Sequence, residues 1–223
     1  LAIANAEITL TGAAPAMTNV YGKLSLETDM ATIVLNQANI ANLALQYGRM
    51  TIPSPMAGTV PQAEVKMAFK GSLSTAIAVG GEFGLGRVGI FEVGTMRPQG
   101  EVELALSAAF PIRQNLDRDA ISLAIDATIS DGSFQNLPYG TTIKNADLVA
   151  NFARDVIEIS GKAAIAGIFG DFSFRSDAGN NNVSFIGKAA PSRTMAQMLA
   201  DIIGVDVGGQ VGGSVTMSGD MAL

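Results

Sequence analysis

Histidine, cysteine and tryptophan are entirely missing from this chain of 223 residues. The absence of cysteine excludes a disulfide framework, a thiolate nucleophile and a cysteine-based zinc site. The absence of histidine removes the usual general base of a hydrolase triad, and no Ser-x-x-Lys sequence offers a substitute. We therefore expect that the protein is not an enzyme and uses no cofactor and no metal.

Charge and aromatic side chains are also scarce. Charged residues make up 15% of the chain and aromatic residues 6%, and the net charge of −6 argues against a nucleic-acid partner. The longest run without charge, from Met30 to Gly48, is interrupted by asparagines and glutamines. A membrane-spanning helix needs about 20 predominantly apolar residues, so none is expected.

What the chain does have is an alternation of apolar and polar residues that restarts many times. It is clearest from Glu101 to Phe110, from Ala120 to Ser130 and from Asn145 to Ser160. Successive side chains of a strand point to opposite faces, so each run builds one apolar face. The pattern predicts an all-β fold with strands at Ala2–Leu10, Asn19–Glu27, Thr32–Leu35, Asn42–Tyr47, Gln62–Lys70, Ser72–Val79, Arg87–Val93, Glu101–Phe110, Ala120–Ser130, Ala146–Phe152, Val156–Ile165, Asp171–Ser176, Val183–Gly187 and Gln210–Met221.

One segment has helical spacing instead. Between Ser192 and Ile203 the apolar residues recur on one face, Ser192 is a suitable N-cap, and Gly204 is a suitable stop. We expect one short amphipathic helix here, near the C-terminus. It would either pack on the sheet as a lid or act as a mobile plug of an apolar groove.

The number of strands constrains the architecture. About 14 strands spaced roughly 4.8 Å apart would make a sheet about 65 Å wide, and twisted sheets of more than about ten strands curl, close or split. We predict an elongated, curled antiparallel sheet that forms a single unit over residues 1–223, with a sub-boundary near 111–120. Its edge strands, near Ala2–Leu10 and Gln210–Met221, would invite edge-to-edge association.

The second half of the chain resembles a known family. The resemblance rests on Asp126–Gly140 leading into Ile143–Phe152, on Ile157–Phe174, and on the helical segment followed by Val211–Leu223. These stretches are similar to the C-terminal part of the AsmA-like family, which includes the YhdP and TamB relatives. The resemblance implies a U-shaped, taco-like β groove that passes phospholipid between the inner and outer membranes of Gram-negative bacteria.

The resemblance also implies a place in the cell and a set of lining residues. Members are periplasmic, serve outer-membrane biogenesis and carry an N-terminal inner-membrane anchor, so we expect this chain to be a segment of a longer protein whose other parts contact the membranes. The expected partners are phospholipid acyl chains. The groove would be lined by Val102, Leu104, Leu106, Ile121, Leu123, Ile125, Ile129, Leu148, Phe152, Ile157, Ile159, Ile165, Phe172 and Phe174.

A second interpretation stays open from the sequence alone. The same apolar faces could meet one another in the closed core of a structural or adhesive surface protein, either a sandwich or an autotransporter-like passenger. The two interpretations differ in shape, because only the first leaves apolar side chains accessible to a hydrocarbon chain.

Overall fold

The structure is a computed structural model that describes residues 1–8, 15–53, 60–82, 87–88, 91–92, 97–113, 120–135, 142–153, 156–165, 167–177, 180–188 and 214–221. Its elements are β1 (Ala2–Ile8), β2 (Met17–Leu26), β3 (Met30–Ile40), β4 (Leu43–Pro53), β5 (Gln62–Ser72), α1 (Leu73–Gly80), β6 (Arg87–Val88), β7 (Phe91–Glu92), β8 (Gln99–Pro111), β9 (Ser122–Phe134), β10 (Ile143–Ala153), β11 (Val156–Ile165), β12 (Ile168–Asp177), β13 (Asn180–Lys188) and β14 (Ser214–Met221).

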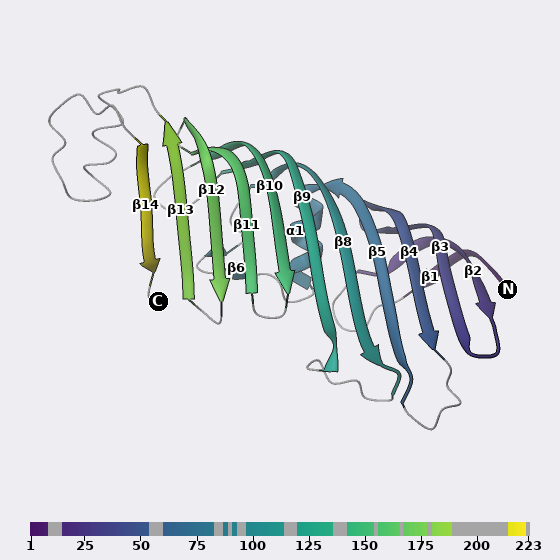
Figure 1. Ribbon diagram of the computed structural model, residues 1–223. Coiled ribbons are helices and arrows are strands. Elements are labelled where there is room, and N and C mark those ends of the chain that lie inside the picture. The colour runs from purple at the N-terminus through teal and green to yellow at the C-terminus, as the bar shows by residue number, and fades with distance from the viewer. Residues whose placement is uncertain are drawn as a thin grey trace, which may run out of the picture.

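The expected all-β fold is confirmed. Twelve strands form one antiparallel sheet in the order β1-β2-β3-β4-β5-β8-β9-β10-β11-β12-β13-β14, so each strand pairs with the next one along the chain (Figure 1). Among the strands of the described residues, the short β6–β7 pair alone lies outside this order. The sheet is continuous from β8 to β9, which flank residues 111–120.

Two of the predicted strands are wrong. Ser72–Val79 is not a strand, because α1 begins there: Ser72 is the N-cap, and its hydroxyl accepts a hydrogen bond from the Thr75 amide at 3.2 Å. Arg87–Val93 is divided into the two-residue strands β6 and β7. The predicted helix at Ser192–Ile203 lies outside the described residues.

The two faces of the sheet differ in chemistry, as the alternation predicts. Val102 lies opposite Ile129 on β9, and Ile129 lies opposite Leu148 on β10, so these three apolar side chains share one side of the sheet. Glu101 and Glu103, between these apolar positions, project to the other side. We call the apolar side the inner face and the charged side the outer face.

The sheet curls because several strands carry bulges at left-handed residues. Asn5, Asn19, Asp131 and Asn145 all have φ near +50°, and each lies at or beside a shift in strand register. A bulge bends its strand and increases the local twist, and asparagine and aspartate tolerate the left-handed conformation better than other side chains. In Figure 1 the strands bend over at their upper ends, and α1 lies within the bend.

Two groups of buried side chains occupy the inner face. The N-terminal cluster includes Val20, Leu43 and Phe69, and the central cluster includes Val102, Ile129, Leu148 and their neighbours on β9–β11. The helix joins the two clusters, since it contributes Val79 to the first and Leu73 to the second. The core of this fold is therefore the inner face of one sheet together with one short helix.

Candidate functional site: the apolar inner face

The residues predicted to line a groove share one face of the sheet. Register pairs Leu104 with Ala127 and Leu106 with Ile125 across β8 and β9. Further along, Phe152 pairs with Ile157 and Ile159 pairs with Phe174. Of the fourteen residues, only Ile121 lies outside a strand, immediately before β9, and it is 36% exposed.

Burial divides these fourteen residues into two kinds. Four are core residues: Val102, Ile129, Leu148 and Phe174, exposed by 2%, 8%, 4% and 4%. The others in strands keep an intermediate exposure: Leu104, Leu106, Leu123, Ile125, Phe152, Ile157, Ile159, Ile165 and Phe172. A ligand on this face would therefore contact the half-buried residues, and the four core residues would lie beneath or beside it.

The half-buried side chains continue onto strands of the N-terminal half, which the sequence interpretation did not include. Gly48 pairs with Met67, Met50 pairs with Val65, and Ile33 pairs with Met50. Together they form a continuous row across seven neighbouring strands, which we call the apolar band: Ile33, Met50, Ile52, Met67, Leu106, Ala108, Phe110, Leu123, Ile125, Phe152 and Ile157. The period-2 alternation of Gln62–Lys70 was the signal that could have extended the prediction to this half.

The charged side chains of the central strands lie on the opposite, outer face. There Lys70 stands opposite Glu103 and bonds to its carboxylate at 2.9 Å, with Glu101 at 3.7 Å. Arg175 pairs in the same way with Glu158 on β11 and with Asp177. The Glu103 carboxylate, with Glu101 as a weaker contributor, raises the pKa of Lys70 above its usual 10.5.

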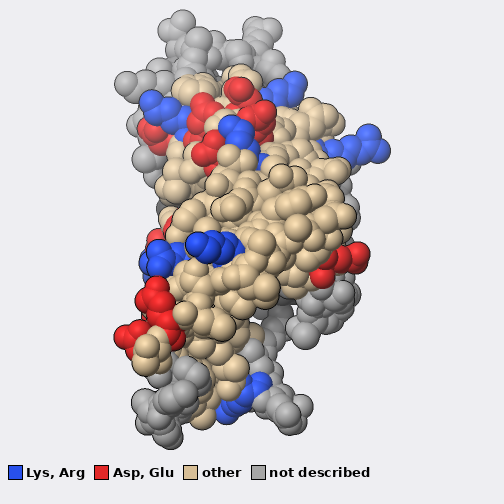
Figure 2. Space-filling view, turned by 90° about the vertical axis from the view of Figure 1, so that its right-hand side faces the viewer, with Lys and Arg blue, Asp and Glu red and all other residues tan. Residues whose placement is uncertain are grey.

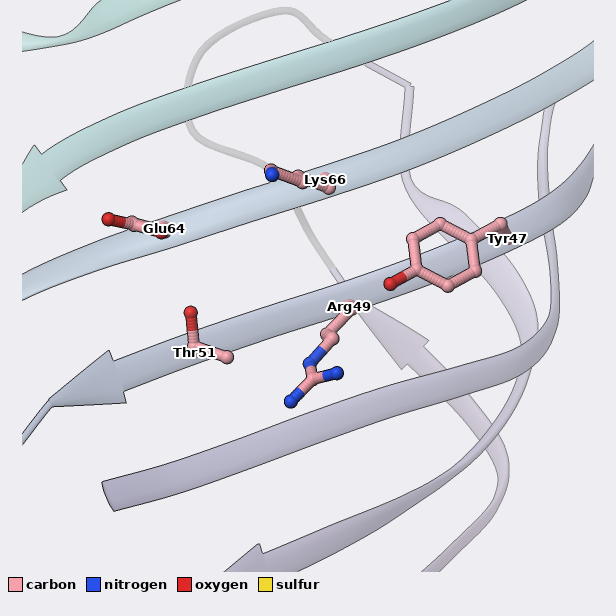
Figure 3. A pocket seen from close by; sticks show the side chains of 5 residues that line it. All are labelled: Tyr47, Arg49, Thr51, Glu64 and Lys66. Carbon is pink, nitrogen blue, oxygen red and sulfur yellow. The ribbon is translucent and has the colours of Figure 1, made fainter. Parts of the chain in front are cut away.

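The outer face also holds a shallow hollow of about 250 Å³ (Figure 3). Tyr47, Arg49 and Thr51 of β4 and Glu64 and Lys66 of β5 line it. Arg49 and Lys66 stand directly opposite each other, and the Arg49 guanidinium points away from Lys66 in Figure 3. Like charges at directly opposite positions repel, so this divergence is the expected arrangement.

The described residues hold no cluster of three or more Asp, Glu, His or Cys side chains that could bind a metal ion. Within the same residues, no helix has both the length and the apolar character that a membrane crossing requires. Seen from the side of β1, most of the visible surface belongs to uncharged residues, and the charged side chains form small separate groups (Figure 2).

Comparison of the chain with protein-family models, with curated proteins and with solved structures finds no match.

Proposed function

We propose that this chain is a segment of a lipid-transfer protein that binds phospholipid acyl chains along the inner face of its curled sheet. The observation that carries the proposal is the apolar band: half-buried aliphatic and aromatic side chains in a continuous row, with the charged side chains of the same strands on the outer face. These side chains are less completely buried than Val102 or Leu148, so part of their surface is accessible to a ligand.

The dimensions of the band suit a hydrocarbon chain. Its seven strands span six inter-strand spacings, or about 29 Å at roughly 4.8 Å each. One leaflet of a bilayer core is about 15 Å thick, half of the roughly 30 Å hydrocarbon thickness. An acyl chain lying across the strands therefore fits within the band with length to spare.

The energetics favour passage more than capture. Removing a methylene group from water is worth about 0.8 kcal/mol, so an acyl chain does not cross an aqueous gap unaided. The side chains of the apolar band, such as Leu106, Ile125 and Phe152, provide an environment as apolar as the bilayer. An acyl chain therefore gains little free energy by staying on the band. The head group needs no partner on this face and can remain in water.

The resemblance to the AsmA-like family extends the proposal to the cell. In that setting the segment would lie in the periplasm and carry phospholipid between the inner and outer membranes, with other parts of a longer protein contacting each membrane. The alternative, a structural or adhesive β protein, draws support from the two buried clusters, which show that much of the inner face is packed.

Native mass spectrometry of the protein purified in mild detergent separates these two functions. We expect the wild type to retain phospholipid and Leu123→Asp to lose it, because a carboxylate in the band would have to be desolvated against the acyl chain. The matched control is Ser122→Asp, one residue earlier and exposed, which should retain lipid. A wild type without phospholipid after incubation with lipid vesicles would reject the proposal in favour of the structural alternative.

A further inference from the structure

A second group of half-buried apolar side chains lies on the inner face, beyond the central cluster. Phe134 pairs with Ile143, Ile143 pairs with Ile165, and Ile165 pairs with Ile168 at the other ends of β9–β12. We call these four residues the upper patch. Phe134 and Ile143 pack against the central cluster from this side, and Phe152 of the apolar band packs against the same cluster.

The central cluster separates the upper patch from the apolar band. Along β9, the buried residues Ala127 and Ile129 lie between Ile125 of the band and Phe134 of the patch. The nine residue steps from Ile125 to Phe134 correspond to about 30 Å of strand at roughly 3.3 Å per step. On β10, Ala146, Leu148 and Ala150 are all at most 4% exposed, so the separation extends to the neighbouring strand.

The helix α1 packs against the central cluster, which separates the upper patch from the apolar band. Leu73 is 3% exposed and belongs to the central cluster, while Val79 is 9% exposed and belongs to the N-terminal one. Ala76 packs against both, as does Leu104 of β8. Ser74 and Ala78, on the side of the helix away from the sheet, are exposed. The helix is thus fixed across the inner face where the two clusters meet.

We propose that α1 and the central cluster act as a wall that confines hydrocarbon to the apolar band, so that acyl chains run across strands β3–β11 and do not reach the upper patch. This inference rests on the proposed function and specifies the path of the lipid on the same face. An eight-residue helix has only marginal stability in isolation. The packing of Leu73, Ile77 and Val79 against the sheet therefore holds α1, and with it the wall, in place.

The chemistry and the length of the band both suit a hydrocarbon ligand. Its residues supply no charged side chain, and its strands carry their charges on the outer face. Its length of about 29 Å, at roughly 4.8 Å per strand, exceeds that of one acyl chain. The lipid would therefore be recognised by its tails alone, with no selection among head groups.

Photocrosslinking at native phenylalanine positions tests this path with minimal disturbance. Phe110 and Phe152 lie in the band, Phe134 lies in the upper patch, and Phe169 is 53% exposed on the outer face. Each is replaced singly by p-benzoylphenylalanine, and the protein is irradiated with phosphatidylethanolamine–phosphatidylglycerol vesicles that carry radiolabelled acyl chains. We expect crosslinks at Phe110 and Phe152, and only the background level of Phe169 at Phe134.

The outcomes distinguish the two proposals. Equal crosslinking at Phe134 and Phe152 would overturn the wall while leaving lipid binding intact. Background crosslinking at every inner position would overturn lipid binding itself. The combined variant Ile77→Ala and Val79→Ala, with strand content checked by circular dichroism, should raise crosslinking at Phe134 above the Phe169 background. A folded variant that leaves Phe134 at background would show that α1 is not part of the wall.

Discussion

Val102 on β8 lies directly opposite Ile129 on β9, and the two side chains are 2% and 8% exposed at the centre of the inner face. The pair joins strands on either side of residues 111–120. It also belongs to the cluster that receives Leu73 of α1. This contact therefore couples the sheet to the helix, and the proposed wall rests on residues that also stabilise the fold.

Truncation at this contact should be costly. We expect Ile129→Ala to lower the free energy of unfolding by about 2–5 kcal/mol, because it removes buried methyl groups and leaves a cavity. Thr128→Ala, on the exposed face of the same strand, should change it by no more than about 0.5 kcal/mol. Urea unfolding followed by circular dichroism measures both, and similar losses in the two variants would contradict the assignment of faces.

Substitution by alanine should change the stability of the protein in opposite directions at two glycines. Gly161 has φ of +148°, and an added Cβ would lie 2.1 Å from the Asp147 carbonyl oxygen, so Gly161→Ala should destabilise the protein by more than about 1 kcal/mol. Gly81, at the C-terminal end of α1, has φ of −58° and open space around its Cβ position. Gly81→Ala should stabilise the protein by about 0.4–1 kcal/mol. Thermal unfolding of both variants, referred to wild type, measures the difference in sign.

The bulge at Asn145 should depend on its left-handed backbone. Asn145→Gly should be tolerated, because glycine adopts φ of +48° without a steric cost. Asn145→Val should cost about 1–2 kcal/mol, the penalty of a left-handed conformation for an ordinary side chain. Chemical denaturation of the two variants gives the comparison. Equal stability would mean that the bulge does not set the bend at β10.

The ion pair of Lys70 gives a pH prediction. Its pKa is raised in the folded protein, so any stabilisation from the pair is fully present below the unfolded value of 10.5 and is lost as the pH rises through the higher folded value. Titration of the Lys70 ammonium by heteronuclear NMR should show its pKa fall in Glu103→Gln, and fall less in Glu101→Gln. An unchanged pKa in Glu103→Gln would show that the contact does not persist in solution.

The sequence predicts the faces of this sheet better than its boundaries. The assignment of Leu106, Ile125 and Phe152 to one face follows from period-2 alternation, which the backbone of any strand imposes. The same reasoning wrongly predicted a strand at Ser72–Val79. The apolar residues of this segment fit a strand with Leu73, Ile77 and Val79 on one face, and they fit a helix equally well. The hydroxyl of Ser72 and the inner face that α1 covers decide the outcome.

The local sequence pattern also does not predict how deeply each residue of one face is buried. Val102 and Leu106 have the same parity on β8, yet only Val102 is fully buried. The difference comes from α1 and from the curl, and both depend on contacts between segments far apart in the chain. The positions of the bulges at Asn5, Asn19 and Asn145 are set in the same way, since other described asparagines, such as Asn36 and Asn151, have ordinary backbone angles.

The strictly sequential order of the strands has a consequence for how such a protein can change in size. Because each strand of the sheet pairs with its neighbours in the order of the chain, most of the sheet is held by contacts between successive strands, as in repeat proteins. Adding or deleting two consecutive strands preserves both the antiparallel alternation and the identity of the two faces. Evolution or design can therefore adjust the reach of this sheet in steps of about 10 Å, two spacings of roughly 4.8 Å, without redesigning the hairpins already present.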